Sequence, residues 1–362
     1  MKLCIVYNFA QKYREGIFRL LENYYECLWV FGNNSTDIKP LEHSIFRNVH
    51  EVTNKKILGP IYYQTGSAKL LFENDNVLML GELFCLSTWI VLILRRFFFR
   101  KKKVFLWSHG WYGREGCVKR LLKRCFFGMS DASFLYGNYA LDIARLQGYK
   151  KNNLHVIYNS LNYDEQVSIR ERIGKTDIYR EHFGNNKPVL VFIGRLTMVK
   201  HLDLLVNAMS IMPGKYNLVF VGDGEMRREL EDMVRKQGLE QYVWFYGACY
   251  DELKNAELLS NADLCVSPGN VGLTAIHSMT YGTPVLTHDN YAFQMPEFES
   301  IKEGKTGAFY QCGSEVSLME TINQWFKVKS DLREEVRLCC YMEVEKRWNP
   351  HVQLEIFKSI IK

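Results

Sequence analysis

Short apolar runs alternate along this chain with segments of helical periodicity. Most of the runs are continuously apolar, which is typical of strands buried on both faces of a parallel sheet. Their repetition in two blocks predicts an α/β protein with two doubly wound domains. The expected strands are residues 3–7, 77–80, 104–107, 133–136, 154–158, 189–193, 217–221, 242–246, 263–267, 284–287 and 307–310, and clear helical patterns cover 201–212, 225–237 and 274–281.

The domain organisation follows from length and from one polar segment. The 362 residues suffice for two domains of about 150–200 residues, each with its own core. Apolar residues make up 47% of the chain and charged residues 24%, which excludes a disordered protein. The polar, poorly periodic segment 162–187 predicts domains at 1–165 and 166–349. Asn349-Pro350 interrupts the last helical pattern, so a separate helix at 350–362 could pack back on the first domain.

Two cations follow the apolar run at 189–193. This run ends directly in Gly194 and Arg195, and Lys200 lies where the next helix begins. The carboxyl ends of parallel strands form the crevice in which α/β sheets bind ligands. Arg195 would bring a planar charged fork suited to two phosphate oxygens, and Lys200 a compact point charge. Alone, the two side chains could equally be solvated surface charges.

A glycine turn follows a second strand of the same domain. It contains Gly269 and Gly272 and leads into a helix that begins near Thr274. Glycine lets the backbone approach a ligand closely, and a helix N-terminus offers unpaired N–H groups and a favourable dipole to an anion. By itself this could be a plain strand-to-helix loop. With the two cations it predicts a clamp for a nucleotide diphosphate, whose donors would be the N–H groups of Thr274 and Ala275 and the Thr274 hydroxyl.

Two other strand ends carry weaker signals. Val221-Gly222-Asp223-Gly224 lacks the third glycine of the dinucleotide fingerprint, so it predicts a tight turn and not an NAD site. In the N-terminal half, His109 follows the run at 104–107. It could donate to a sugar hydroxyl or titrate near neutral pH. As a lone histidine it could equally be structural.

No metal or cofactor is expected. No two aspartates are spaced D-x-D, and there is no cluster of His and Cys residues. A divalent metal carrying the diphosphate is therefore not indicated, and protein cations would have to neutralise the phosphate charge. The ten cysteines form no C-x-x-C pair, which indicates reduced thiols in a cytosol. The N-terminus enters a strand with no cleavable small-residue site behind it, so no secretory signal is expected.

Basic charge is concentrated in the N-terminal half. Residues 1–165 contain 23 Lys and Arg against 14 Asp and Glu, whereas the rest contains 23 against 26. An apolar run at 83–94, too short to span a bilayer, leads into the basic and aromatic segment 95–103, and 118–124 is a second basic patch. This pattern suits an interfacial helix on an anionic membrane surface, and equally a core helix with a charged tail. No recognition motif supports nucleic-acid binding.

Several motifs, in this order, resemble the C-terminal domain of the retaining glycosyltransferases of family four. The resemblance covers about residues 189–330. The N-terminal half matches more loosely, through His109-Gly110 and Asn159. Such enzymes have the GT-B fold, in which two Rossmann-like domains face each other across a cleft. The matching motifs are Gly194-Arg195-Leu196 with Lys200, Val221-Gly222-Asp223-Gly224, Ala262-Asp263, Gly272-Leu273 through Met279, and Gly282-Thr283-Pro284-Val285.

The resemblance also assigns roles to residues. Residues 166–349 would bind a nucleotide-sugar donor, and residues 1–165 an acceptor. Arg195 and Lys200 would hold the diphosphate of the donor as catalytic groups, and His109 would approach the transferred sugar. The further donor-binding residues would be Gly194, Asn270, Gly272, Leu273, Thr274 and His277.

One pair of positions departs from the family. Two glutamates eight positions apart, one reaching the sugar and one the ribose, are here Gly269 and His277. His277 could still hydrogen-bond a ribose hydroxyl. The donor sugar could be gripped through Asn270 and backbone N–H groups; alternatively, the chain has lost catalysis.

The expected function is that of a metal-independent, hexosyltransferase-type glycosyltransferase. It would move a sugar from a nucleotide diphosphate donor to a saccharide or lipid-linked saccharide acceptor, with retention of the anomeric configuration and without a cofactor. A front-side displacement needs no nucleophilic carboxylate. The expected role is in cell-surface polysaccharide or lipopolysaccharide synthesis, in the cytoplasm or peripherally on the inner face of the membrane. Two alternatives stay open: a non-catalytic nucleotide-sugar binding protein and a GT-B epimerase of nucleotide sugars.

Overall fold

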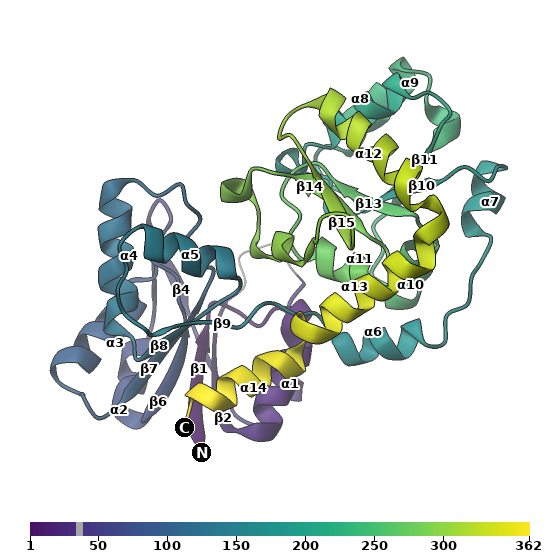
Figure 1. Cartoon of the computed structure of the whole chain (residues 1–362). Helices are drawn as coiled ribbons and strands as arrows, with labels where there is room; N and C mark the ends of the chain where they lie inside the picture. The colour runs from purple at the N-terminus through teal and green to yellow at the C-terminus, as the bar shows by residue number, and fades with distance from the viewer. Residues whose placement is uncertain (34–38) are drawn as a thin grey trace. The chain divides into compact units, whose positions relative to one another are not determined.

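The computed structural model describes residues 1–33 and 39–362. The described residues form two compact units, coloured by residue number in Figure 1. The first unit comprises residues 1–162 and 349–362, and the second comprises residues 163–348. The first boundary lies at the start of the polar segment from which it was predicted, and the C-terminal helix belongs to the first unit.

A parallel sheet with the strand order β3-β2-β1-β6-β7-β8-β9 forms the centre of the first unit. The order reverses between β1 and β6, which is the topological switch point of a Rossmann-like sheet. A short antiparallel hairpin, β4–β5, lies outside it. The strands are β1 Lys2–Tyr7, β2 Glu26–Gly32, β3 Val49–Val52, β4 Asn54–Leu58, β5 Ile61–Gln64, β6 Asn76–Leu80, β7 Lys103–Ser108, β8 Ala132–Leu135 and β9 Leu154–Val156.

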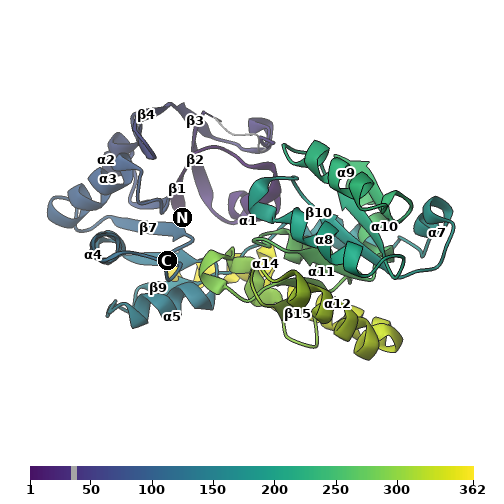
Figure 2. The same cartoon turned by 90° about the horizontal axis from the view of Figure 1, so that it is seen from above.

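Helices cover both faces of this sheet. Successive residues of β1 point to opposite faces: Leu3 and Ile5 join one buried cluster, and Cys4 and Val6 join the other. Helices α1 and α14 supply the first cluster, whereas α3, α4 and α5 supply the second, and Figure 2 shows α3 and α4 beside the strands. The helices are α1 Glu15–Tyr24, α2 Leu70–Glu73, α3 Leu86–Phe97, α4 Cys117–Met129, α5 Asn138–Leu146 and α14 Pro350–Ile360.

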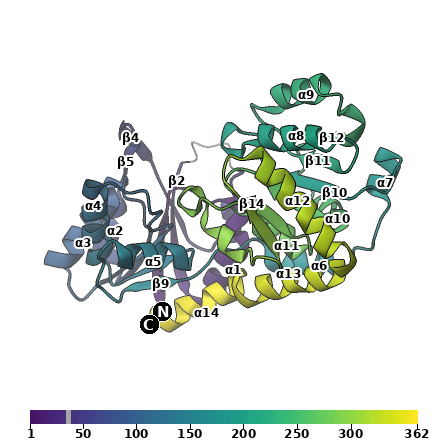
Figure 3. The same ribbon diagram turned by 45° about the horizontal axis from the view of Figure 1, so that its top comes forward.

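The C-terminal helix α14 is part of the first core. Asn349 caps it by accepting a hydrogen bond from the Val352 N–H at 3.0 Å, and Pro350 occupies its first turn. The ring of Phe357 is fully buried, with its centroid 5.0 Å from that of Trp107. Burying such a side chain contributes about 1.5–3 kcal/mol. Figure 3 shows α14 beside α1, which it contacts.

The second unit repeats the architecture. Its parallel sheet has the order β12-β11-β10-β13-β14-β15, with the switch point between β10 and β13. Contacts join α8 with α9 and α12, and α11 with α6 and α13. The strands are β10 Val189–Ile193, β11 Asn217–Val221, β12 Val243–Gly247, β13 Leu264–Ser267, β14 Val285–His288 and β15 Gly307–Tyr310. The helices are α6 Tyr163–Arg170, α7 Ile178–Phe183, α8 Leu202–Ile211, α9 Arg227–Lys236, α10 Glu252–Asn261, α11 Thr274–Thr280, α12 Glu315–Lys329 and α13 Arg333–Arg347.

Every predicted strand is present close to its expected bounds, but β2, β3 and the hairpin strands β4 and β5 were not predicted. Only Tyr25 separates α1 from β2, so the strand begins directly after the helix with no loop between them. Strand β3 is short, and its His50 and Glu51 are exposed, so it lacks the apolar pattern of a buried strand.

No helix among the described residues is long and apolar enough to cross a membrane.

Candidate functional site

The two motifs predicted to bind phosphate lie together in the second unit. Strands β10 and β13 are hydrogen-bonded neighbours, and Gly194-Arg195 and Gly269-Asn270 follow their carboxyl ends. Because these two strands flank the switch point, both motifs lie where doubly wound sheets bind their ligands. Tertiary structure therefore brings together residues that are about seventy positions apart.

Lys200 links the two motifs. Its ammonium group donates to the backbone oxygen of Asn270 at 2.6 Å and to the side-chain Oδ1 of the same residue at 2.7 Å. Asn270 therefore positions the lysine. An ammonium group has three protons, so one remains for a ligand.

The charge of Lys200 is held in a partly desolvated place. Burial lowers the pKa of Lys200 to about 8; Glu297 opposes this shift and the positive charge of Arg195 adds to it. The lysine is therefore protonated at neutral pH but loses its proton at mildly alkaline pH. A phosphate bound beside it would favour the charged form.

Gly269 occupies the position of the family's first glutamate for a steric reason. Its N–H donates to the Lys200 backbone oxygen at 2.8 Å. A Cβ atom at Gly269 would lie 2.1 Å from the Val199 backbone oxygen and 2.7 Å from the Lys200 Cα. The backbone that carries Lys200 fills the space of a side chain, so a glutamate and this arrangement of the lysine exclude each other.

A carboxylate stands beside His277, the position of the second glutamate. Glu252 at the start of α10 accepts from His277 Nε2 at 2.9 Å through its Oε1. The same oxygen accepts from the Tyr281 hydroxyl at 2.7 Å and from Gln166 Nε2 at 2.9 Å. Burial alone would raise the pKa of Glu252, but His277, Tyr281 and Gln166 lower it to about 2. Glu252 therefore stays ionised at any physiological pH.

Glu252 was missed in the sequence because its partners are remote along the chain. A signal for its position does exist: Asp251 caps α10 by accepting from the Leu253 N–H at 2.9 Å. An Asp-Glu pair after a strand marks a helix start at the carboxyl end of the sheet. It does not reveal that the second carboxylate turns toward His277.

The predicted donors at the start of α11 are partly used within the protein. The Thr274 hydroxyl donates to the Ile193 backbone oxygen at 2.9 Å, and the Ala275 N–H donates to the Gly272 oxygen at 3.1 Å. Both groups therefore have a partner within the protein, and their contact with a diphosphate stays a prediction. A helix leaves its first N–H groups without intrahelical partners, so Leu273 and Thr274 retain backbone donors for a ligand. Gly272 precedes them with φ +51°, in the left-handed region.

The glycines of Val221-Gly222-Asp223-Gly224 serve a close backbone approach. A Cβ atom at Gly222 would lie 1.8 Å from the Gly194 oxygen, and one at Gly224 would lie 2.4 Å from the Leu196 oxygen. The Leu196 N–H donates to the Asp223 oxygen at 2.9 Å. The turn predicted here is present, and its function is to hold the loop that carries Arg195.

Two buried polar side chains, those of Thr287 and Gln294, form hydrogen bonds that hold the glycine turn after β13. The Thr287 hydroxyl lies 2.8 Å from the Ser267 oxygen and 3.0 Å from the Gly269 oxygen. Gln294 donates to this hydroxyl at 2.8 Å and accepts from the Val271 N–H at 2.9 Å. Both side chains are buried. They fix the turn in place, and sequence reasoning did not identify them.

His109 lines a pocket of about 400 Å³ in the first unit. Residues that follow β1, β6 and β7 form its walls, so it lies at the switch point of this sheet. The ring of His109 packs on that of Tyr136, with centroids 4.7 Å apart. Burial, together with the charges of Arg14 and Lys123, lowers the pKa of His109 to about 4. It is therefore neutral at physiological pH and does not titrate there, contrary to one expectation. Its Nδ1 has no hydrogen-bond partner among the described residues.

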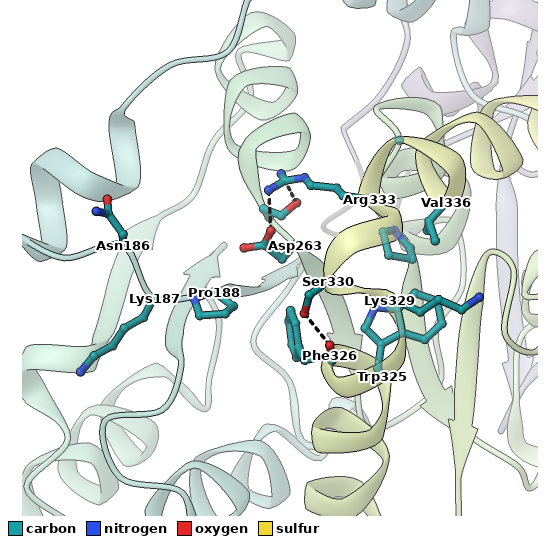
Figure 4. A pocket seen from close by; sticks show the side chains of 13 residues that line it. Asn186, Lys187, Pro188, Asp263, Trp325, Phe326, Lys329, Ser330, Arg333 and Val336 are labelled. Carbon is teal, nitrogen blue, oxygen red and sulfur yellow. Dashed lines mark hydrogen bonds and ion pairs between the residues drawn. The ribbon is translucent and has the colours of Figure 1, made fainter.

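A second pocket, of about 230 Å³, lies at the amino ends of β10, β13 and β14 (Figure 4). Arg333 crosses it to form an ion pair with Asp263 and donates to the Ala262 oxygen at 3.0 Å. Doubly wound sheets bind ligands at the opposite end of their strands. These contacts join α13 to the sheet and are structural.

Two further observations concern metals and thiols. Within residues 1–33 and 39–362, no three His, Cys, Asp or Glu side chains are grouped so that they could hold a metal ion. The ten cysteines are free thiols.

Comparison with known proteins supports the assignment of the second unit. Residues 175–337 match the family of glycosyl transferases group 1. An uncharacterized glycosyltransferase of Methanocaldococcus jannaschii is 32% identical over 151 residues, which are 38% of this chain and 36% of the relative. An uncharacterized 41.2 kDa protein in the cps region of Klebsiella pneumoniae is 26% identical over 65% of this chain and 60% of its own length. The matches thus span less than two thirds of these relatives.

Solved structures match over the whole chain and confirm the GT-B fold with two Rossmann-like domains. Anabaena HepE in complex with UDP has a TM-score of 0.76 at 17% identity, covering 99% of both chains. The lipopolysaccharide outer core galactosyltransferase WaaB has a TM-score of 0.72 at 16% identity, covering 100% of this chain and 99% of WaaB.

We expect Lys200 to set the alkaline limit of activity. Deprotonation above about pH 8 removes a positive charge, so kcat/KM should fall as pH rises through this value. In Lys200→Arg the charge persists and the fall near pH 8 should disappear. Lys200→Ala and Arg195→Ala each remove a charged hydrogen bond worth about 1.5–3 kcal/mol, which lowers turnover about 10- to 200-fold. A pH–rate profile of the three variants tests this, and an unchanged alkaline limb in Lys200→Arg would contradict it.

We expect Gly269→Ala to destabilise the second unit. Its Cβ would collide with the Val199 oxygen, and such overpacking costs about 1–3 kcal/mol. Calorimetric unfolding should show a lower midpoint than in the wild type. Gly174→Ala is the matched control, because Gly174 lies in the same unit with no atom within 4 Å of an added Cβ. Equal midpoints for the two variants would refute the steric account of the missing glutamate.

Proposed function

We propose that this protein is a glycosyltransferase that transfers a sugar from a nucleotide diphosphate donor, bound by the second unit, to an acceptor bound by the first. The observation that carries the proposal is the position of Lys200, which is hydrogen-bonded to Asn270 beside Arg195 at the switch point. This cation is held in place before any ligand binds. The match of residues 175–337 to group 1 glycosyltransferases supports the same reading.

The chemical demand is the departure of a nucleotide diphosphate. Negative charge develops on the leaving oxygen as the bond to the anomeric carbon breaks. Arg195, Lys200 and the first N–H groups of α11 would stabilise this charge, and because they are already oriented, little reorganisation is needed in the transition state. With Gly269 lacking a carboxylate, we propose front-side displacement with retention, in which the leaving phosphate accepts the proton of the acceptor hydroxyl.

We further propose that Glu252 and His277 bind the ribose of the donor together. Their hydrogen bond places an ionised carboxylate next to the family's second glutamate position. A carboxylate accepts from ribose hydroxyls as a glutamate at 277 would. This pair argues against a chain that has lost its donor site.

The donor, the acceptor and the cellular role are also proposals. HepE was solved with UDP and UDP-glucose, and a Mycobacterium tuberculosis relative is named as a GDP-mannose-dependent mannosyltransferase, so a hexose on UDP or GDP is proposed. The cps-region relative and the fold of WaaB favour a saccharide or lipid-linked acceptor in cell-surface polysaccharide synthesis. Such synthesis would place the protein in the cytoplasm, at the inner face of the membrane.

We expect turnover to persist in excess EDTA, because protein cations replace a metal at the diphosphate. A panel of UDP- and GDP-hexoses is incubated with glycan acceptors, and release of the nucleoside diphosphate is measured. Acceptor-dependent release supports transfer. Binding without release would instead support a nucleotide-sugar binding protein, and an isomerised intact donor an epimerase. Loss of activity in EDTA that magnesium or manganese restores would refute metal independence.

We also propose that the first unit docks on an anionic membrane. At the end of α3, Phe97 and Phe98 are 64% and 73% exposed, and Val118 on the neighbouring α4 is 74% exposed. Such exposed apolar side chains beside cations suit a lipid interface. Of the basic segment 95–103, however, Arg95 forms a half-buried ion pair with Asp131, and Lys102 donates to the Asn74 oxygen. The expectation that the whole segment is a lipid-facing tail is therefore too broad. The exposed cations of the two basic segments, 95–103 and 118–124, are Arg96, Arg100, Lys101, Lys103, Lys119, Arg120 and Arg124.

We expect the full chain to bind anionic vesicles reversibly. Each cation near the surface contributes about 1 kcal/mol, screened within about 10 Å at 0.1 M salt. Co-sedimentation should weaken as salt rises and weaken further when Arg96, Arg100 and Lys101 are changed to glutamine. The control changes Lys175, Lys236 and Lys305, which are exposed in the second unit, and so removes the same charge. Equal binding by the two triple variants would overturn the proposal, as would no binding at low salt.

A further inference from the structure

Arg14 is a buried cation without an acidic partner. It lies at the end of the turn Lys12–Arg14 that precedes α1 and is 4% exposed. One guanidinium nitrogen donates to the Tyr136 hydroxyl, whereas Nε and Nη1 have no hydrogen-bond partner among the described residues. No Asp or Glu of the described chain forms an ion pair with it. Buried charges in proteins are normally paired, because desolvation is costly.

Aromatic rings surround this guanidinium. Its Cζ atom lies 4.9 Å from the ring centroid of Trp107, 5.2 Å from that of Tyr136 and 5.4 Å from that of Tyr7. Cation–π contacts stabilise the side chain and fix its direction. They do not neutralise it, and arginine keeps its proton at every pH at which proteins fold.

Arg14 is one of the residues that line the 400 Å³ pocket, which His109 also lines. The other charges of this pocket are only partly balanced, because the partner of Glu82 is a neutral hydroxyl. Lys123 forms an ion pair with Glu115 at 2.7 Å, and the pKa of His109 is too low for it to be charged. Glu82 accepts from the Tyr62 hydroxyl at 2.8 Å. Among the described residues the pocket therefore has two cations without an ion pair, Arg14 and the exposed Lys119, against the single carboxylate of Glu82.

We propose that this pocket selects an acceptor that carries an oxyanion, a phosphate or a carboxylate, and that Arg14 determines this specificity. The inference rests on the proposed transferase function and names the chemical class of its acceptor. An oxyanion would supply a negative charge to pair with the Arg14 guanidinium. The attraction between two opposite charges is strong in a pocket of low dielectric constant. A neutral sugar would leave the guanidinium unpaired, and sites with unmet polar groups reject such ligands strongly. Glu82 and His109 are suited to the hydroxyl groups of the same ligand.

The test compares three probes on the wild-type full chain: glucose 1-phosphate, glucuronate and glucose. Isothermal titration calorimetry should show at least tenfold tighter binding of one or both anions than of glucose. Tight binding of glucose 1-phosphate alone identifies phosphate as the recognised group, and tight binding of glucuronate identifies the carboxylate. Binding of glucose as tight as that of both anions would overturn the proposal without any variant.

Three variants locate the site. Arg14→Gln should lose the preference for the anion. Arg145→Gln, an exposed arginine of α5 outside the pocket, should keep it. Lys200→Gln in the second unit should also keep it, which separates this pocket from the diphosphate clamp. If Arg14→Gln binds the anions like the wild type, Arg14 does not determine specificity.

Two controls separate the possible failures. Circular dichroism and nucleotide binding report whether Arg14→Gln is folded; if it is not, Arg14→Lys, which keeps the charge but loses the fork, should bind the anions more weakly. Donor turnover is measured in parallel. Anion preference without turnover on any donor would contradict the proposed function alone. Turnover with glucose but not with either anionic sugar would contradict the acceptor proposal alone.

Discussion

The second unit depends on a close approach of backbone segments that no side chain could share. Gly222 and Gly224 bring the turn after β11 against the loop that carries Arg195, and Gly269 brings the turn after β13 against Lys200. Any Cβ at these positions would meet a carbonyl oxygen or backbone carbon well inside van der Waals contact. The three segments are therefore held as one body at the carboxyl ends of the strands. This close packing brings the backbone of Lys200 near Asn270, and the hydrogen bonds of Lys200 to Asn270 depend on it.

Electrostatics follow from the same packing. Desolvation lowers the pKa of Lys200 to about 8. Because this value is still above neutral pH, the lysine remains charged there, and its ammonium group is less hydrated than that of an exposed lysine. Its interaction with a bound phosphate is stronger in such a place than in water. A glycine at position 269 is part of this arrangement, since the backbone of Val199 and Lys200 fills the space of a side chain there. Glu252, held ionised by three donors, restores a carboxylate beside His277.

The first unit uses the equivalent position of its own sheet differently. Its switch point carries a pocket with aromatic walls, a neutral histidine and the buried Arg14. Both units thus hold a cation at the carboxyl ends of a Rossmann-like sheet. In the second unit the partners of Lys200 are neutral oxygens, and in the first the neighbours of Arg14 are aromatic rings.

Local pattern was sufficient for eleven of the fifteen described strands, for helices α8, α9 and α11, for the two-unit organisation and for the position of Arg195 and Lys200 at a strand end, because apolar periodicity and glycine turns act over a few residues. It failed at β2, which follows a helix with no loop between them, at β3, which is largely exposed, and at the hairpin β4–β5, which has few buried residues. Contacts between distant segments lay beyond it. These include the Thr274 hydroxyl turned to β10, the pairing of Glu252 with His277 and the ion pair that takes Arg95 out of the basic segment. The sequence by itself determined which residues could form a site. Only the tertiary structure decided which of them are already bonded to one another and which, like Arg14, keep a charge for a ligand, because burial and pairing are properties of the folded chain.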